Sequence, residues 1–131
     1  MEAMFDTRAK IISGAEAVRV LCERSSSFIV VTGHFDPVVA AHVHRLEEIA
    51  GPNGRLFVIV LPPPDPILPQ RARAELVAAL RMVDHVAPCD EREAKVLLGC
   101  ARYAAIVREE SADLARRSQL AEMVRRRNNA G

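Results

Sequence analysis

Residues 28–61 have the sequence FIVVTGHFDPVVAAHVHRLEEIAGPNGRLFVIVL. The stretch opens and closes with short, unbroken runs of mostly apolar and β-branched residues, at positions 28–32 and 56–61. Such runs are typical of strands that are covered on both faces. Between them, apolar residues recur at helical spacing over 40–50, and the turn residues at 51–54 end the pattern. This strand–helix–strand unit has a crossover long enough to join parallel strands.

The same alternation of helical and extended patterns covers the rest of the chain. Apolar spacing predicts helices over residues 8–24, 76–83, 94–101 and 111–127, and short strands over 85–87 and 103–107. Asp6 or Thr7 is the expected cap of the first helix. Alternating elements predict an α/β fold with a small parallel sheet and helices on both faces. We expect one domain over residues 1–131, with an N-terminal helix (8–24), a core (28–108) and a basic C-terminal helix or tail (111–131).

Composition excludes several classes of protein. Of the 131 residues, 50% are hydrophobic and 27% are charged, which fits one soluble globular domain and not a disordered segment. No apolar run approaches the roughly 20 residues that cross a bilayer, so we expect no membrane partner. Cys22, Cys89 and Cys100 are too few and too far apart for a disulfide framework or a Cys-x-x-Cys metal site. They predict free thiols and a cytoplasmic location.

Basic charge is concentrated at the C-terminal end. Residues 116–131 carry five arginines against one glutamate, although the net charge of the whole chain is only +1. A basic helix end can bind nucleic acid, but aromatic residues for base stacking are not interleaved here and make up 4% of the chain. We therefore expect no nucleic-acid partner and interpret these arginines as a solvated helix face that complements the helix dipole.

The junction after the first predicted strand is the expected functional site, because parallel sheets bind ligands beyond the carboxyl ends of strands where the strand order reverses. Gly33 allows a tight turn and a close approach of the backbone to a ligand. The helix that begins near Ala40 directs free N–H groups to the same place, which suits a phosphate, and His42 lies in its first turn. The alternative is that Gly33 only makes the turn and His42 caps or packs locally, and the residue types alone leave both interpretations open.

Residues 28–46 resemble the opening of the cytidylyltransferase-like nucleotidyltransferases, in which a strand is followed by the pattern G-x-F-D-x-x-H-x-G-H and a helix. The residues that fall on the Gly, Phe, Asp and second His of this pattern are Gly33, Phe35, Asp36 and His42. Residues 73–86 are similar to a second family pattern, R-A-E-L-L-x-A-L…V-D-x-V. The resemblance covers about residues 8–108 and is closest to the adenylyltransferase domain of the ADP-heptose synthases and to the glycerol-3-phosphate cytidylyltransferases. It implies a three-layer, Rossmann-like nucleotidyltransferase fold.

The resemblance also implies an activity. A phosphorylated sugar or alcohol attacks the α-phosphate of ATP or CTP with Mg²⁺ assisting, and pyrophosphate leaves without a covalent enzyme intermediate. The implied nucleotide contacts are Thr32, Gly33, His34, Phe35, Asp36, Ala41, His42 and Arg73. Of these, His42 is the expected catalytic residue. Relatives of this kind are commonly dimeric, so a homodimer is implied as well.

Departures from the family pattern favour a second hypothesis. Val39 stands in place of the first motif histidine and Ala41 in place of the motif glycine, and the Ser/Thr-rich segment that closes over the nucleotide is missing. Losing one preorganised donor typically costs on the order of 10² to 10³ in rate. The alternative function is therefore a catalytically inactive nucleotide-binding or protein-interaction homologue, unless His34 in the same turn acts as the second catalytic residue.

Two residues near the junction have competing interpretations. Asp36 is expected to anchor the turn through hydrogen bonds to nearby backbone N–H groups rather than to act as a general base. Arg73 either reaches a phosphate from the start of its helix or pairs with Glu75 or Asp84 at the surface.

The remaining histidines near the junction give weaker signals. His44 lies about 200° around the helix from His42, so we expect it to face solvent. A metal site built from His34, Asp36 and His42 is not demanded by their spacing, and no metal ligand is predicted.

Overall fold

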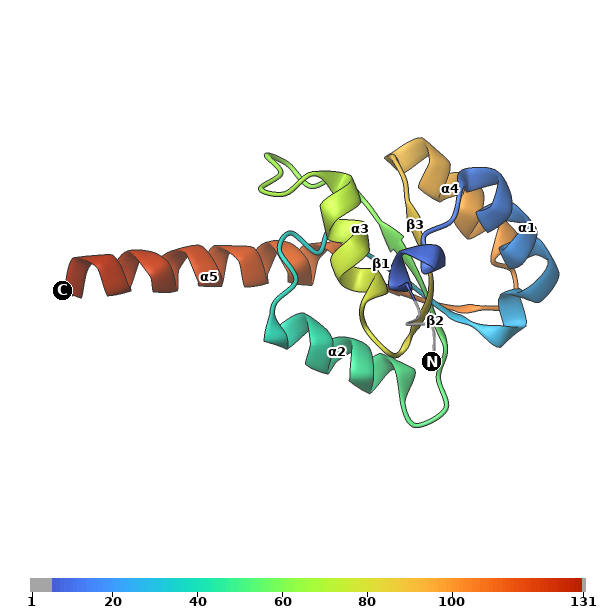
Figure 1. Ribbon diagram of the computed structural model, residues 1–131, viewed down its shortest axis with the longest axis horizontal. Helices are drawn as coiled ribbons and strands as arrows, with labels where there is room; N and C mark the ends of the chain where they lie inside the picture. Colours follow the sequence, from blue (N-terminus) through green and yellow to red (C-terminus); the bar gives the residue numbers. More distant parts are fainter. Residues whose placement is uncertain (1–5, 131) are drawn as a thin grey trace, which may run out of the picture.

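The computed structural model describes residues 6–130, which form a parallel sheet with helices on both faces (Figure 1). The strands are β1 (Ile29–Gly33), β2 (Leu56–Val60), β3 (Val83–Pro88) and β4 (Ala105–Arg108). They lie in the order β3-β2-β1-β4, and each neighbouring pair is parallel. The predicted α/β fold with a four-stranded parallel sheet is confirmed.

The helices that cover the sheet form two layers. One layer contains α1 (Gly14–Arg24) and α4 (Glu91–Cys100), and the other contains α2 (Ala40–Ala50) and α3 (Gln70–Ala78). Successive residues of β1 enter different cores, since Val30 packs with the first layer and Val31 with the second. Both side chains are fully buried, and such burial contributes about 1.5–3 kcal/mol for each. The double coverage explains why the strand sequences are almost continuously apolar rather than alternating.

The predicted helix over residues 8–24 is wrong over residues 8–13, because α1 begins at Gly14. Thr7–Lys10 form a short 3-10 turn, η1, which Asp6 caps by accepting a hydrogen bond from the backbone N–H of Arg8 at 3.0 Å. The chain is then extended, and the N–H of Ile12 donates to the carbonyl oxygen of Val86 at 3.0 Å. Ser13 ends this segment because its hydroxyl accepts from the N–H of Glu16, which makes it the N-cap of α1. A capping serine inside the apolar pattern therefore outweighs the helical spacing.

The other predicted elements exist, most of them with shifted ends. The bounds of α2 are those predicted, but α3 begins at Gln70, before the predicted 76, and ends at Ala78. Val83 was expected in that helix and instead begins β3. The start of α4 moves to Glu91 because Asp90 and Glu93 form a capping box, in which each side chain accepts the other residue's backbone N–H.

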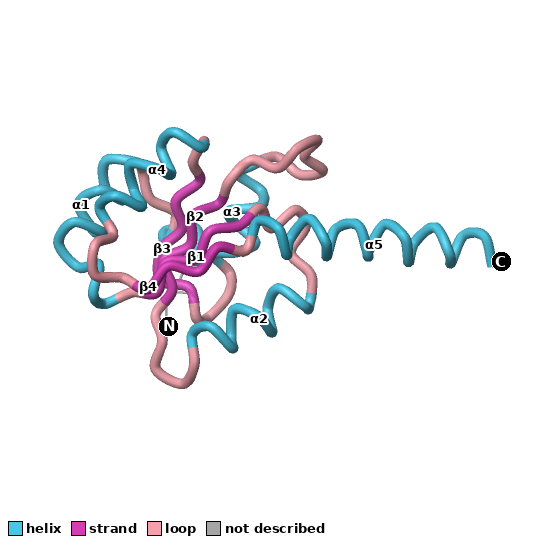
Figure 2. Tube along the Cα trace, turned by 180° about the vertical axis from the view of Figure 1, so that it is seen from behind, coloured by secondary structure: helices cyan, strands magenta, loops and turns pink. Residues whose placement is uncertain are grey.

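The helix α5 (Glu110–Ala130) leaves the body of the molecule, as both Figure 1 and Figure 2 show. Its side chains from residue 121 to residue 129 are all exposed, and Arg125 and Arg126 pair with Glu122 along the helix. For this distal half, the predicted solvated face is confirmed. None of the helices in residues 6–130 has the length and apolar character that crossing a bilayer requires.

Candidate functional site

The loop after β1 lies where the strand order reverses. The chain continues from β1 to its neighbour β2 on one side, whereas β4 pairs with β1 on the other side. Residues 34–39 therefore emerge at the carboxyl end of the sheet between two diverging connections. This is the position at which open parallel sheets bind ligands, and it is where the sequence predicts the site.

A buried guanidinium supports this loop. Arg73 is 2% exposed, and its Nη1 donates to the carbonyl oxygens of His34 at 2.9 Å and Leu61 at 2.8 Å. Its Nε donates to the carbonyl oxygen of Leu68 at 3.2 Å. Burial lowers the pKa of Arg73, and the charge of Asp36 opposes that shift. Arg73 thus joins the loops that follow β1 and β2.

The predicted surface pairing of Arg73 with Glu75 or Asp84 is wrong. Glu75 pairs instead with Arg71, at 3.2 Å, and Asp84 pairs with Arg55. The buried position of Arg73 explains the difference, since its donors are engaged with backbone carbonyl groups beneath the loop. The other expected role of Arg73, contact with a phosphate, stays a prediction.

Asp36 joins the same two loops from above. Its Oδ2 accepts from the N–H of Ile67 at 2.7 Å, and its Oδ1 accepts from the N–H of Leu68 at 2.8 Å. Backbone hydrogen bonds to Asp36 were expected, and they exist. The predicted location of the donors is wrong, however. They belong to the loop after β2 and not to the turn that contains Asp36.

His42 is buried in the first turn of α2, with 4% of its surface exposed. Its Nδ1 accepts a hydrogen bond from the backbone N–H of Val39 at 3.1 Å, so the expectation of local capping is confirmed for this nitrogen. Because Nδ1 is an acceptor, the proton of the neutral ring is on Nε2. That nitrogen lies 2.8 Å from Oδ1 of Asp113 but is not aligned to donate to it, and it has no aligned partner within the described residues. His44 is exposed, as predicted.

The carboxylate of Asp113, in the first turn of α5, contacts the loop after β1 close to His42. Oδ2 of Asp113 accepts from the backbone N–H of His34 at 2.8 Å and of Phe35 at 3.3 Å. Phe35 has a φ of 52°, and the local backbone directs these two successive N–H groups to one oxygen. Oδ1 accepts from Nη1 of Arg116 at 2.9 Å. We call the N–H groups of His34 and Phe35, together with Nε2 of His42, the anion cradle.

The anion cradle changes the acidity of the carboxyl group that it holds. Burial alone raises the pKa of Asp113, because it penalises the charged form. The contact with His42 and the hydrogen bonds from the backbone of His34 and Phe35 outweigh that effect, so the pKa of Asp113 lies below its ordinary value. The cradle therefore favours an anion.

The remaining predicted site residues lie around the cradle in different ways. Gly33 faces the Asp113 carboxylate, Ala41 is exposed on α2, and the ring of Phe35 packs 5.7 Å from the ring of His42. Thr32 is fully buried, and its hydroxyl oxygen has no partner within the described residues.

His34 also lines a neighbouring cleft of about 330 Å³. Lys95, Arg108 and Glu110 also line this cleft, which lies between α4 and the end of β4. Nδ1 of His34 is buried without a partner in the described part of the chain, and burial lowers the pKa of this histidine. His34 thus donates its backbone N–H to the anion cradle and also lines the adjoining cleft.

Sequence reasoning missed the part of α5 that completes the site. Arg116 contacts Asp113, and Arg117 donates through Nη1 to the carbonyl oxygen of Pro64 at 2.9 Å and through Nη2 to that of Asp65. The interpretation as a solvated face is therefore wrong for these two arginines. Acidic residues are common in the first turn of any helix, so Asp113 gave no signal beyond that local preference.

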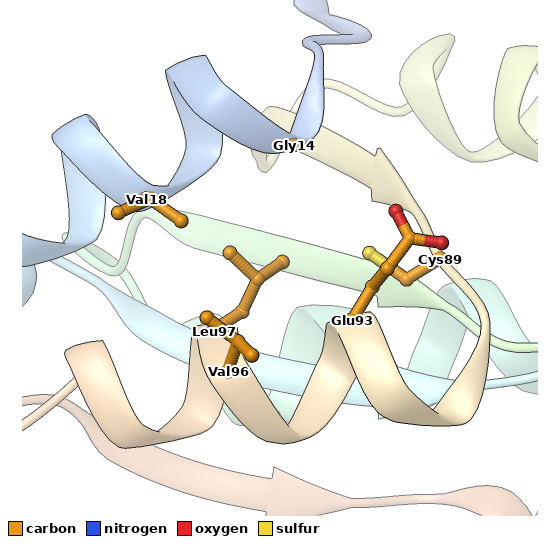
Figure 3. Close-up of a pocket in the computed structure, with 6 residues that line it drawn as sticks. All are labelled: Gly14, Val18, Cys89, Glu93, Val96 and Leu97. Carbon is orange, nitrogen blue, oxygen red and sulfur yellow. The ribbon is translucent and has the colours of Figure 1, made fainter.

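The described residues contain no group of three or more His, Cys, Asp or Glu side chains that is arranged to hold a metal ion. A separate hollow of about 170 Å³ lies between α1 and α4, with Val18, Leu97, Cys89 and Glu93 among its lining residues (Figure 3). It belongs to the α1 and α4 layer and is mostly apolar, whereas His42 lies in the α2 and α3 layer.

Comparisons with known proteins give a partial match. No family model matches the chain. It is 38% identical to the FAD synthase of Methanohalophilus mahii over 63 residues, which cover 44% of this chain and 44% of that protein. It is 41% identical to the FAD synthase of Halobacterium salinarum and 40% identical to that of Methanosphaerula palustris, in each case over 63 residues and 44% of this chain.

The match spans less than half of the length of each of these relatives, 41–44%. The relatives belong to the cytidylyltransferase-like nucleotidyltransferase superfamily, whose Rossmann-like fold agrees with the parallel sheet described above. They are FAD synthases, and not the sugar-phosphate or glycerol-phosphate enzymes that the motifs also resemble. Over the matched part, the chain is thus similar to archaeal FAD synthases of that superfamily.

Proposed function

We propose that the chain binds the triphosphate of ATP at the anion cradle and transfers the adenylyl group to FMN. A phosphate oxygen of FMN would attack the α-phosphorus of ATP, the bond from that phosphorus to the β-bridging oxygen would break, and pyrophosphate would leave. The FAD synthase relatives favour ATP over CTP and FMN over a phosphorylated sugar as substrates.

The anion cradle is the observation that carries this proposal. Two backbone N–H groups converge on one point at the carboxyl end of β1, and Nε2 of His42 lies beside it at the start of α2. Backbone N–H groups and a helix N-terminus together form a ready site for phosphate oxygens. Because Arg73 and Asp36 fix the supporting loops, the donors are held in place before a ligand arrives, which is what charge stabilisation in a transition state requires.

Mg²⁺ enters this proposal with the nucleotide. The described residues offer no cluster of three or more metal-ligating side chains. Mg²⁺ commonly keeps several water ligands and binds through the phosphates of a nucleotide. When bound in that way, it would neutralise part of the charge on the triphosphate.

Nucleotide binding without turnover is the alternative function. Val39 caps α2 through its backbone, but its side chain cannot donate a hydrogen bond to a phosphate, although it takes the place of the first motif histidine. A missing donor of this kind typically lowers the rate by about 10²–10³-fold. The ring of His34 lies in the same loop and has a buried nitrogen without a partner in residues 6–130, so it is the candidate to supply what Val39 lacks.

A thermal-unfolding series tests the binding step. ATP, CTP, GTP and UTP, each with Mg²⁺, are added to the wild type, to His42→Ala and to His44→Ala. His44 is the matched control because it is exposed on the same helix. A ligand at about 100 times its Kd adds roughly 2.7 kcal/mol to stability, which raises the Tm by several degrees. We expect ATP to raise the Tm of the wild type and of His44→Ala but not of His42→Ala. The absence of a shift with every nucleotide, in the wild type and also in Asp113→Ala, would refute the proposal.

Product analysis then separates the two functions. Incubation with ATP, Mg²⁺ and FMN should yield FAD and pyrophosphate if the chain is a transferase. Binding of ATP without either product would identify the chain as a nucleotide-binding homologue. Equal turnover by the wild type and His42→Ala would show that the reaction does not use the anion cradle.

A further inference from the structure

We infer that Asp113 is a built-in competitor of the nucleotide, whose carboxylate occupies the anion cradle until α5 moves away and a phosphate takes its place. This inference rests on the proposed function, because it concerns the regulation of the same site. It assigns a role to α5, which lies outside the two sequence motifs quoted above.

The contacts of Asp113 are those that a phosphate would make. Its two oxygens accept from the backbone of His34 and Phe35 and from Arg116, and Oδ1 lies 2.8 Å from Nε2 of His42. Only 2% of the side chain is exposed, so the cradle is covered, and its two backbone N–H groups are also engaged. A ligand cannot use these donors while the carboxylate is there.

Asp113 and a phosphate also exclude each other by charge. Asp113 is ionised above its lowered pKa, and two anions at hydrogen-bonding distance in a buried place repel each other strongly. Space leads to the same conclusion, because Oδ2 already approaches the backbone of Gly33 so closely that even a Cβ atom there would lie 2.5 Å from it. Binding of a phosphate therefore requires that Asp113 leaves.

The attachment of α5 suits such a movement. From residue 118 to residue 129 its side chains are exposed, apart from the half-buried Leu120. The helix is fastened near its start, by Asp113 and Arg116 at the cradle and by Arg117 on the loop that follows β2. Displacing α5 therefore breaks a small set of polar contacts and exposes little of the core.

The tether makes the competition strong. A group held next to its site by a short link acts at an effective concentration in the millimolar range or above. Free pyrophosphate or ATP must overcome that local concentration, so the affinity of the wild type is expected to be weaker than the cradle alone would allow. Removing the carboxylate should restore the intrinsic affinity.

The test compares pyrophosphate and ATP–Mg²⁺ as probes by isothermal titration calorimetry. The proteins are the wild type, Asp113→Ala, Asp113→Asn and, as matched control, Glu122→Gln, which removes an exposed carboxylate from the same helix. We expect Asp113→Ala to bind both probes at least about tenfold more tightly than the wild type. Asp113→Asn should change the affinity in the same direction but by less, since the amide still fills the space. Glu122→Gln should match the wild type.

Hydrogen exchange gives a second readout in the unmodified 131-residue chain. Saturating pyrophosphate should accelerate exchange of the backbone amides in the first turns of α5, because the ligand displaces Asp113. If Asp113→Ala does not fold, Asp113→Asn and this exchange experiment decide the matter without it.

The outcomes separate this inference from the proposed function. If the wild type binds ATP but the Asp113 variants bind equally or more weakly, and α5 exchange does not rise, Asp113 positions His42 instead and the inference is wrong while the function stands. If neither the wild type nor any Asp113 variant binds either probe, the proposed function fails, and the inference fails with it.

Discussion

A Cβ atom on Gly33 would lie 2.5 Å from Oδ2 of Asp113. Glycine at the end of β1 thus makes room for a carboxylate that comes from the far end of the chain. The sequence left two interpretations of Gly33 open, a close approach of the backbone to a ligand or only a tight turn. The structure has that close approach, and the group that makes it belongs to α5.

The first prediction follows from this contact. Gly33→Ala should destabilise the fold by about 1–3 kcal/mol, because the new methyl group meets Asp113 and the ring of Phe35, at 2.8 Å, in a packed environment. Urea denaturation measures the change. Gly99→Ala is the matched control, since a Cβ there has nothing within 4 Å. It should be neutral or stabilise α4 by up to about 1 kcal/mol.

A double-mutant cycle shows whether the cost comes from Asp113. In the Asp113→Ala background, Gly33→Ala should cost less by at least about 0.5 kcal/mol, although the contact with Phe35 persists. Strictly additive effects would mean that the steric contact with Asp113 contributes nothing to the cost.

The second prediction concerns the buried guanidinium of Arg73. Arg73→Met leaves the carbonyl oxygens of His34 and Leu61 without their donor, and each buried acceptor left unpaired costs about 1–3 kcal/mol. We expect a loss of about 2–5 kcal/mol in the free energy of unfolding. Arg71→Met, on the exposed side of the same helix, should change it by no more than about 0.5 kcal/mol. Equal effects of the two variants would contradict a structural role for Arg73.

Most of the fold follows from local rules. Residues 28–61 contain two doubly covered strands and one amphipathic helix, and apolar spacing alone locates them to within a residue. The helix over 8–24 was mispredicted because Ser13 supplies a cap inside an otherwise helical pattern. Val83 was misassigned because one apolar residue fits the end of a helix and the start of a strand equally well.

The site was less predictable, for a physical reason. His42 follows the loop after β1 within a few residues, so a sequence motif can locate the loop and the histidine together. Asp113 contacts the backbone of His34 across 79 positions, and Arg73 reaches the same residue across 39. The packing of α3 and α5 brings Arg73 and Asp113 to His34. Both contact its backbone, and because every residue type has the same backbone groups, the sequence does not indicate these pairs.

The third prediction concerns the reactivity of the thiols. Burial, with the nearby charges of Glu93 and Asp90, raises the pKa of Cys89 to about 12, so it stays a thiol at neutral pH (Figure 3). Cys22 is exposed on α1. At pH 8 the folded protein should react with a thiol reagent at Cys22 far faster than at Cys89, and Cys89 should react only after addition of denaturant. Peptide mapping by mass spectrometry identifies the labelled residues, and rapid labelling of Cys89 in the folded state would contradict the burial described.

The last prediction is a pH dependence of stability due to His34 and His85. Burial is the largest cause that lowers the pKa of both, and His85 packs against the rings of Phe28 and Phe57. Below the unfolded value of about 6.5, the unfolded chain therefore binds more protons than the folded one. Stability should fall as the pH drops from about 6.5 toward the lowered folded pKa.

Urea denaturation at pH 7.5, 6.5 and 5.5 measures this loss, and His85→Gln and His34→Gln should each make the dependence on pH shallower. These pH values lie above the region near pH 4 and below, in which protonation of Asp113 would remove its contribution to stability, because the pKa of Asp113 is lowered. A wild-type stability that is constant or rises between pH 6.5 and 5.5 would mean that these histidines accept protons in the folded state, and that the rings are more open to water than the packing described here.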